Sequence, residues 1–258
     1  MKLINPDDPP APLDDAARAT VAGLARRQVG ANGLLMKAIA FVGGGLEDGL
    51  KILPKGLRDP VEQAAQAALW QAYRLAETSR TRGPVTRLTG DRTHRLLATL
   101  SGALGGAGGL PTALAELPVA TTLIFRAVQD VAAQYGEDPA TDATRAECLR
   151  VFGAGADGTL DTAWIGARLT LTGPAIHALI AKVAPRFGLV VGQKLLGQAV
   201  PVIGAVAGAG TNWAFMRFYT DMAHVHFGLR AAARQHGDTA VLDHFHATLA
   251  AARLPARN

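Results

Sequence analysis

Polar side chains able to support catalysis occur in two stretches of the chain. Arg126 and Asp130 are four residues apart, a spacing that lets them pair on one face of a helix. Further along, Asn212 precedes Asp221 and His224, and the last two are three residues apart, so they share a helix face. A carboxylate and an imidazole placed in this way form half of a metal site or an acid–base pair. One hypothesis is therefore a metal-dependent or acid–base enzyme that uses these five side chains, provided that folding brings them together.

Other catalytic patterns are missing from the sequence. His224 and His226 point to different sides of a helix, unlike the i, i+4 pair of a helical zinc motif. There is no Gly-x-Ser-x-Gly elbow of the serine hydrolases, and no phosphate-binding loop follows a strand. Cys148 has no histidine near it in sequence to activate a thiolate. We therefore assign no catalytic residue, expect no metal and no cofactor, and favour a protein that is not an enzyme.

Six arginines are concentrated between residues 74 and 95, where only Glu77 and Asp91 oppose them. An uncharged, glycine-rich stretch, Leu96–Ala115, follows directly. A basic cluster next to an apolar stretch is typical of proteins that bind anionic lipid at the cytoplasmic face of a membrane. The alternative is a solvated loop in front of buried helices. Nucleic acid is not expected, because this run has no aromatic residue after Tyr73 and the net charge is only +5. The arginines of this cluster are Arg74, Arg80, Arg82, Arg87, Arg92 and Arg95.

The stretch Leu195–Met216 has no charged residue and is close to the length of a bilayer-spanning helix. It is either a membrane-embedded element or the central helix of a soluble core. Pro201 inside it predicts a kink or a break. Beyond Asn212 a helix is expected, because apolar residues recur at three- and four-residue spacing while Arg217 and Asp221 lie on the opposite side. The apolar stripe consists of Phe215, Phe218, Met222, Val225, Leu229 and Ala232.

Helical signals recur along the rest of the chain, and strand patterns are almost absent. Hydrophobic residues make up 49% of the 258 positions and aromatic residues only 5%, so small side chains that allow close helix packing dominate. We predict an all-α fold, a compact multi-helix bundle with glycine-rich apolar hairpins at its centre. A disordered leader is expected over residues 1–12 and a single domain over 13–258. The predicted helices cover 13–27, 61–78, 117–135, 138–152 and 164–182, the last broken at residues 173–174.

Two blocks of this sequence resemble the EcsC family. The first is Leu117–Asp138 with its continuation Arg145–Gly153, and the second is Gln198–Asn212 with its continuation through Phe218 to Arg230. The family is named for a protein encoded beside the ATPase and membrane subunits of a bacterial ABC transporter. The resemblance therefore implies a membrane-associated or accessory role in a bacterial cell, and it assigns no reaction.

Together these observations favour a non-enzymatic, membrane-associated accessory protein of the EcsC type. The arginine cluster would bind anionic lipid, or a membrane-protein partner such as an ABC transporter, at the cytoplasmic face. The single cysteine fits a reducing compartment, so we expect a cytoplasmic location peripheral to the inner membrane. The enzyme described above is one alternative. A structural protein that forms homo-oligomers is another, because the glycine-rich stretches contain GxxxG spacings.

Overall fold

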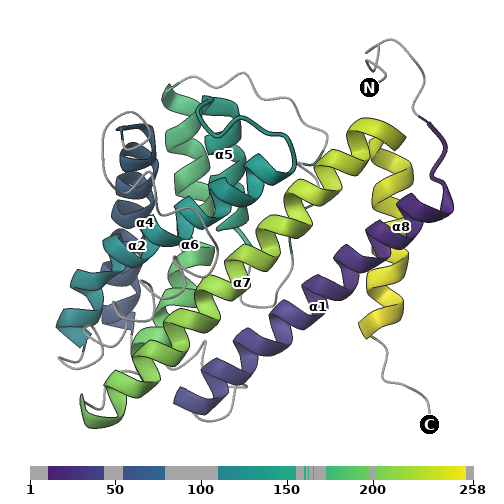
Figure 1. The fold of residues 1–258 in the computed structure, drawn as a ribbon. Coiled ribbons are helices and arrows are strands. Elements are labelled where there is room, and N and C mark those ends of the chain that lie inside the picture. The colour runs from purple at the N-terminus through teal and green to yellow at the C-terminus, as the bar shows by residue number, and fades with distance from the viewer. Residues whose placement is uncertain are drawn as a thin grey trace, which may run out of the picture.

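The computed structural model describes residues 11–43, 55–78, 110–154, 160, 162, 165, 173–197 and 201–253. These residues form a compact all-α bundle, as predicted, and contain no strand (Figure 1). The helices are α1 (Asp15–Gly43), α2 (Lys55–Thr78), α4 (Leu110–Gln134), α5 (Asp142–Val151), α6 (Gly173–Gly197), α7 (Pro201–His236) and α8 (Asp238–Arg253).

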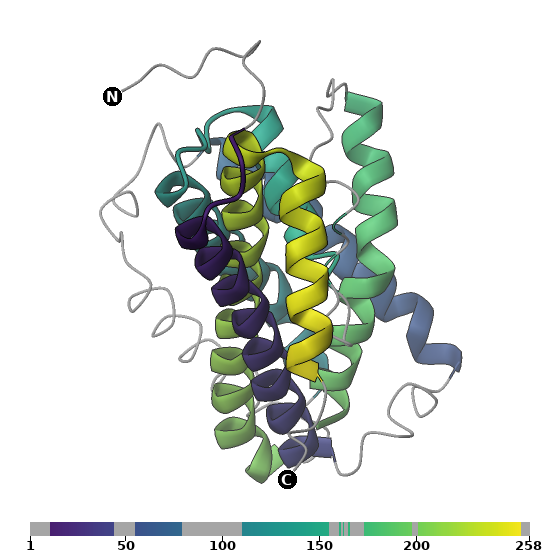
Figure 2. The ribbon, with the colours of Figure 1, turned by 90° about the vertical axis from the view of Figure 1, so that its right-hand side faces the viewer.

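Helix α7 is the element around which the bundle is arranged. Its 36 residues run beside α1 in the antiparallel direction, and this pair has the most extensive contact between any two helices described (Figures 1 and 2). Helix α8 turns back and packs on both α1 and α7, while α4 and α5 contact α7 from the other side. Helices α2 and α6 pack on each other and on α4, and α6 also contacts α1 and α7. Because α7 has neighbours on most sides, it is buried nearly all round after residue 213.

The hydrophobic core consists of two clusters that meet at α7. The larger joins α2, α4, α5, α6 and α7, and includes Phe218 and Phe227. At its centre the Phe152 ring stacks on Phe125 and Tyr219. The smaller cluster joins α1, α7 and α8 through residues such as Leu229. The apolar stripe predicted for α7 is confirmed, since its first five members are buried and the sixth is partly buried.

Local capping sets several helix ends. The Asp14 carboxylate accepts a hydrogen bond from the backbone N–H of Ala17 at 2.7 Å, as expected for an N-cap. Thr141 caps α5 in the same way through the N–H of Thr144. Gly136 and Gly237, with φ of 79° and 82°, follow α4 and α7, because a left-handed residue ends a helix and glycine adopts it without strain.

Four helices extend beyond their predicted ends. Helix α6 begins at the predicted break and continues past residue 182 to Gly197. Helix α1 continues past Arg27 to Gly43 through a glycine-rich stretch, and α2 and α4 begin six and seven residues before the predicted starts. Pro60 and Pro118 lie inside α2 and α4 instead of at their starts. Helix propensity predicted ends at the glycine-rich stretch and at the two prolines. Burial of neighbouring side chains such as Val61 and Leu117 outweighs the free-energy cost of glycine or proline in a helix.

The uncharged stretch Leu195–Met216 falls across the end of α6 and the first half of α7. Pro201 is the first residue of α7, a position where its missing N–H costs no hydrogen bond, so the predicted break lies at this proline. By length and composition alone, one helical stretch among the described residues could cross a bilayer. It is Pro174–Gly192 in α6, and more than half of it is buried in the fold, as is common for core helices.

Candidate functional site

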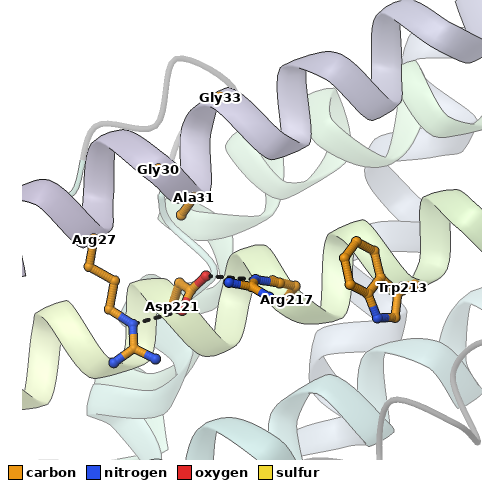
Figure 3. A pocket seen from close by; sticks show the side chains of 7 residues that line it. All are labelled: Arg27, Gly30, Ala31, Gly33, Trp213, Arg217 and Asp221. Carbon is orange, nitrogen blue, oxygen red and sulfur yellow. Dashed lines mark hydrogen bonds and ion pairs between the residues drawn. The ribbon is translucent and has the colours of Figure 1, made fainter.

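The polar face of α7 that carries Asp221 lies against α1. Trp213, Arg217 and Asp221 follow one another at four-residue steps, so they form a single row along the helix. From α1, Arg27 brings its Nε to 2.7 Å from Oδ1 of Asp221. The Nε of Arg217 lies 3.4 Å from the other oxygen, Oδ2 (Figure 3). One carboxylate therefore holds two guanidinium groups that come from two different helices.

A cavity of about 590 Å³ opens beside this ion group. Gly30 and Gly33 form its α1 wall, and a Cβ atom built on either would meet no other atom within 4 Å. Ala31, which is buried, and Trp213, which is partly exposed, also line it (Figure 3). The cavity thus exists because two residues of α1 lack side chains. Its volume lies in the range of sites that bind small molecules.

The charges of this site are not balanced among its lining residues. Two arginines face one aspartate, which leaves the cavity with a net charge of +1. The side chains of Arg27 and Arg217 are 40% and 47% exposed, whereas that of Asp221 is only 10% exposed. The guanidinium of Arg217 also lies 6.0 Å from the ring centre of Trp213. The cations therefore reach water while their shared anion does not, so the site attracts anions.

A second ion group lies on the other side of α7 and is buried from solvent. The carboxylate of Glu147 on α5 accepts hydrogen bonds from Arg150 Nη1 at 2.5 Å and His226 Nε2 at 2.8 Å. Arg230 Nη1 lies 3.3 Å from the same carboxylate, and its Nε lies 3.3 Å from Glu137. The side chains of Glu147, Arg150 and His226 are at most 6% exposed.

Burial by itself raises the pKa of Glu147. The hydrogen bond and charge of His226, together with the charges of Arg230 and Arg150, outweigh burial and hold this pKa below its usual value. The adjoining cavity, lined in part by Arg150 and His226, has a volume of only about 20 Å³, room for about one water molecule. This group therefore joins α5 to α7 and offers no space for a substrate.

The five predicted polar residues are not gathered at one centre. Asp221 belongs to the α1–α7 cavity, whereas His224 contacts Tyr135, whose hydroxyl lies 3.3 Å from its Nδ1. Asn212 is buried on α7, nine residues before Asp221 and so on the opposite side of the helix. Arg126 and Asp130 lie on α4, and the buried Nε of Arg126 has no hydrogen-bond partner within the part of the chain that the structure describes.

The residues that complete the α1–α7 site were not among those five. Trp213 and Arg217 had a sequence signal, their four-residue spacing from Asp221. Arg27 had none, because it is 194 residues from its partner and its helix was expected to end there. Of the arginine cluster, Arg74 is exposed on α2, and the other five members lie outside the described residues.

Over the described ranges, no group of three or more histidine, cysteine, aspartate or glutamate side chains is placed to hold a metal ion.

Comparison with known proteins identifies the family. Neither the curated proteins nor the solved structures contain a significant match to this sequence. The model of the EcsC protein family matches residues 35–231, which include α4, α5, α6 and all of α7 except its last turn. The chain therefore belongs to the EcsC protein family.

Proposed function

We propose that this protein is a non-enzymatic accessory protein that binds anionic lipid at the cytoplasmic face of a membrane. One observation carries the proposal. Along the antiparallel pair of α1 and α7, charged side chains other than Lys37 stop near Arg27 and Arg217, and Trp213 lies one turn beyond Arg217.

The composition of both helices changes at this level. Helix α1 has four charged residues before Gly30 and only Lys37 after it. Helix α7 has no charged residue from Pro201 to Met216. Because the two helices are antiparallel, these parts, which are uncharged apart from Lys37, lie side by side at one end of the pair (Figures 1 and 2). Each part is about 20 Å long at 1.5 Å per residue, compared with about 15 Å for the hydrocarbon of one leaflet.

The residues at the boundary suit a membrane surface. Trp213 is 37% exposed although it is a large aromatic residue, and tryptophan concentrates where the hydrocarbon meets the head groups. Arginine at the same level extends its charge toward the lipid phosphates while its stem stays in apolar surroundings. An uncharged end bordered by tryptophan and arginine is the arrangement expected for entry into one leaflet.

The arginine cluster of residues 74–95 adds to this proposal from the sequence. Its six cations would supply long-range attraction to anionic lipid, about 1 kcal/mol for each one near the surface. Family membership is consistent with an accessory role, and an ABC transporter remains the partner that the resemblance suggests.

Flotation tests the proposal. The protein is mixed with phosphatidylcholine vesicles with or without phosphatidylglycerol, at low and at high salt. We expect flotation with the anionic vesicles only, weaker at high salt because the Debye length falls from about 10 Å at 0.1 M to about 3 Å at 1 M. Folded protein that does not float with phosphatidylglycerol at low salt would contradict the proposal.

Fluorescence quenching by brominated lipid tests the orientation. The chain has three tryptophans, so single variants assign the signal. Trp213→Phe is expected to lose the emission that brominated lipid quenches, whereas Trp70→Phe, whose ring lies against His177 on α6, is expected to retain it. Equal quenching in both variants would place another surface at the membrane.

A further inference from the structure

We infer that the α1–α7 cavity binds the phosphodiester of a single anionic phospholipid. This inference rests on the proposed membrane binding and deepens it, because it assigns one lipid head group to one site. Three features support it: the unengaged donors of the two arginines that line the cavity, its net charge and its position along the helix pair.

The donors are the terminal nitrogens of the two guanidinium groups. Arg27 and Arg217 each make their closest approach to Asp221 through Nε (Figure 3). No hydrogen bond or ion pair from the Nη nitrogens of either arginine to another residue occurs in the described parts of the chain. Asp221 thus orients both side chains and leaves two pairs of N–H groups directed elsewhere. Guanidinium groups presented in this way bind the oxygens of a phosphate with good geometry.

The net charge selects among phosphate esters. Two arginines and one aspartate leave +1 in the cavity. A phosphodiester carries −1 and neutralises that charge. A phosphomonoester carries about −1.5 to −2 at pH 7 and would leave an excess of negative charge next to Asp221. The site is therefore matched to a diester.

The position of the cavity selects a lipid over a free phosphodiester. The glycines of α1 leave room at the level where both helices lose their charged residues. A head group held by Arg27 and Arg217 would have its acyl chains beside the ends of α1 and α7, where Lys37 is the only charged residue. Trp213 would lie at the level of the glycerol backbone, where tryptophan is favoured.

The first measurement uses soluble head groups. Glycerophosphoglycerol, a phosphodiester without acyl chains, is titrated against the full-length protein by NMR or calorimetry and compared with glycerol phosphate, a monoester. We expect the diester to bind more tightly and to compete with phosphatidylglycerol vesicles. Equal or tighter binding of the monoester would overturn the charge argument.

The second measurement uses variants with matched controls. Arg27→Gln is expected to lower the affinity for the diester about tenfold, the effect of one charge-assisted hydrogen bond. Arg26→Gln makes the same charge change next to the site and is expected to stay within twofold. Gly30→Leu fills the cavity, while Gly23→Leu places the same side chain on the same helix away from it. Both glycines have open space at Cβ and leucine is the better helix former, so both variants should fold.

The outcomes separate the inference from the proposed function. Wild-type flotation with no difference between Arg27→Gln and Arg26→Gln, or between the two leucine variants, would overturn the inference and leave membrane binding intact. Diester binding that depends on Arg27 and Gly30, without flotation, would overturn the proposed function and the lipid identity of the ligand. Flotation and diester binding that both weaken in Arg27→Gln and Gly30→Leu alone would support both.

Discussion

Two ion groups share α7 and differ in their access to water. In the inner group, Glu147 forms ion pairs with Arg150 and His226. All three side chains are at most 6% exposed, and the adjoining cavity has a volume of about 20 Å³. In the outer group, Asp221 forms ion pairs with Arg27 and Arg217, whose side chains are 40% and 47% exposed. The adjoining cavity has a volume of about 590 Å³. Both groups place one carboxylate among several cations.

The difference shows that one helix carries buried charges on one side and solvent-accessible charges on the other. In the inner group each charge has lost its water, so the other members must compensate for it and none is available to a ligand. In the outer group the arginines remain hydrated, so an anion can replace that water at little cost to the fold. The same residue types therefore stabilise the bundle on one side of α7 and line the proposed binding site on the other.

Glu147→Gln is expected to cause the largest loss of stability and so gives the strongest test of the difference between the two ion groups. It keeps the shape of the side chain but removes the carboxylate that Arg150 and His226 contact and leaves Arg230 with Glu137 alone. Removing one member of a buried ion group costs about 3–5 kcal/mol. Urea denaturation should show a correspondingly lower midpoint with an unchanged slope. A loss no larger than that of Asp221→Asn would remove the distinction between the two groups.

Acid should remove the same contribution gradually. The pKa of Glu147 lies below its usual value of 4.5 in the folded protein, so the group stabilises the fold above about pH 4.5 and loses this effect as pH falls through the folded pKa. The difference in unfolding free energy between wild type and Glu147→Gln should therefore shrink between pH 6 and pH 3. A constant difference would show that the charge of Glu147 is not what stabilises the inner group.

Asp221→Asn is the smallest expected change in stability. The arginines around it are solvated, so the loss should be no more than about 1 kcal/mol, as for exposed ion pairs. The site would then carry +2, and flotation with phosphatidylglycerol vesicles at low salt should strengthen about fivefold, equivalent to about 1 kcal/mol for one charge at a membrane surface. Selectivity for the diester over the monoester should decrease. Weaker flotation would show that Asp221 matters mainly by positioning Arg27 and Arg217.

Sequence reasoning recovered much of the fold and part of the site. The apolar stripe of α7 and the end of α4 near residue 135 follow from spacing and local chemistry, and the structure confirms them. The helix ends at Arg27, Val61 and Leu117 were wrong, because propensity measures a local cost and burial of neighbouring side chains exceeded it.

The partners of the polar residues could not be predicted in the same way. Asp221 was singled out, but its partner Arg27 is 194 residues away. Nothing in the sequence around His226 and Arg230 indicated that Glu147 would contact them. Spacing along a helix determines which side chains share a face, and it contains no information about which other helix will cover that face.

The amino-acid sequence by itself determined the class of fold, the family and the uncharged stretches, because helical periodicity, composition and family blocks are properties of neighbouring residues. Only the tertiary structure decided which charged side chains are buried and which are accessible to solvent. The difference depends on how α1, α5 and α7 pack. The glycines of α1 leave a cavity beside Asp221, whereas Glu147 lies on a face of α5 that is buried in the core. Burial sets the cost of a charge, and burial is created by residues distant in the chain.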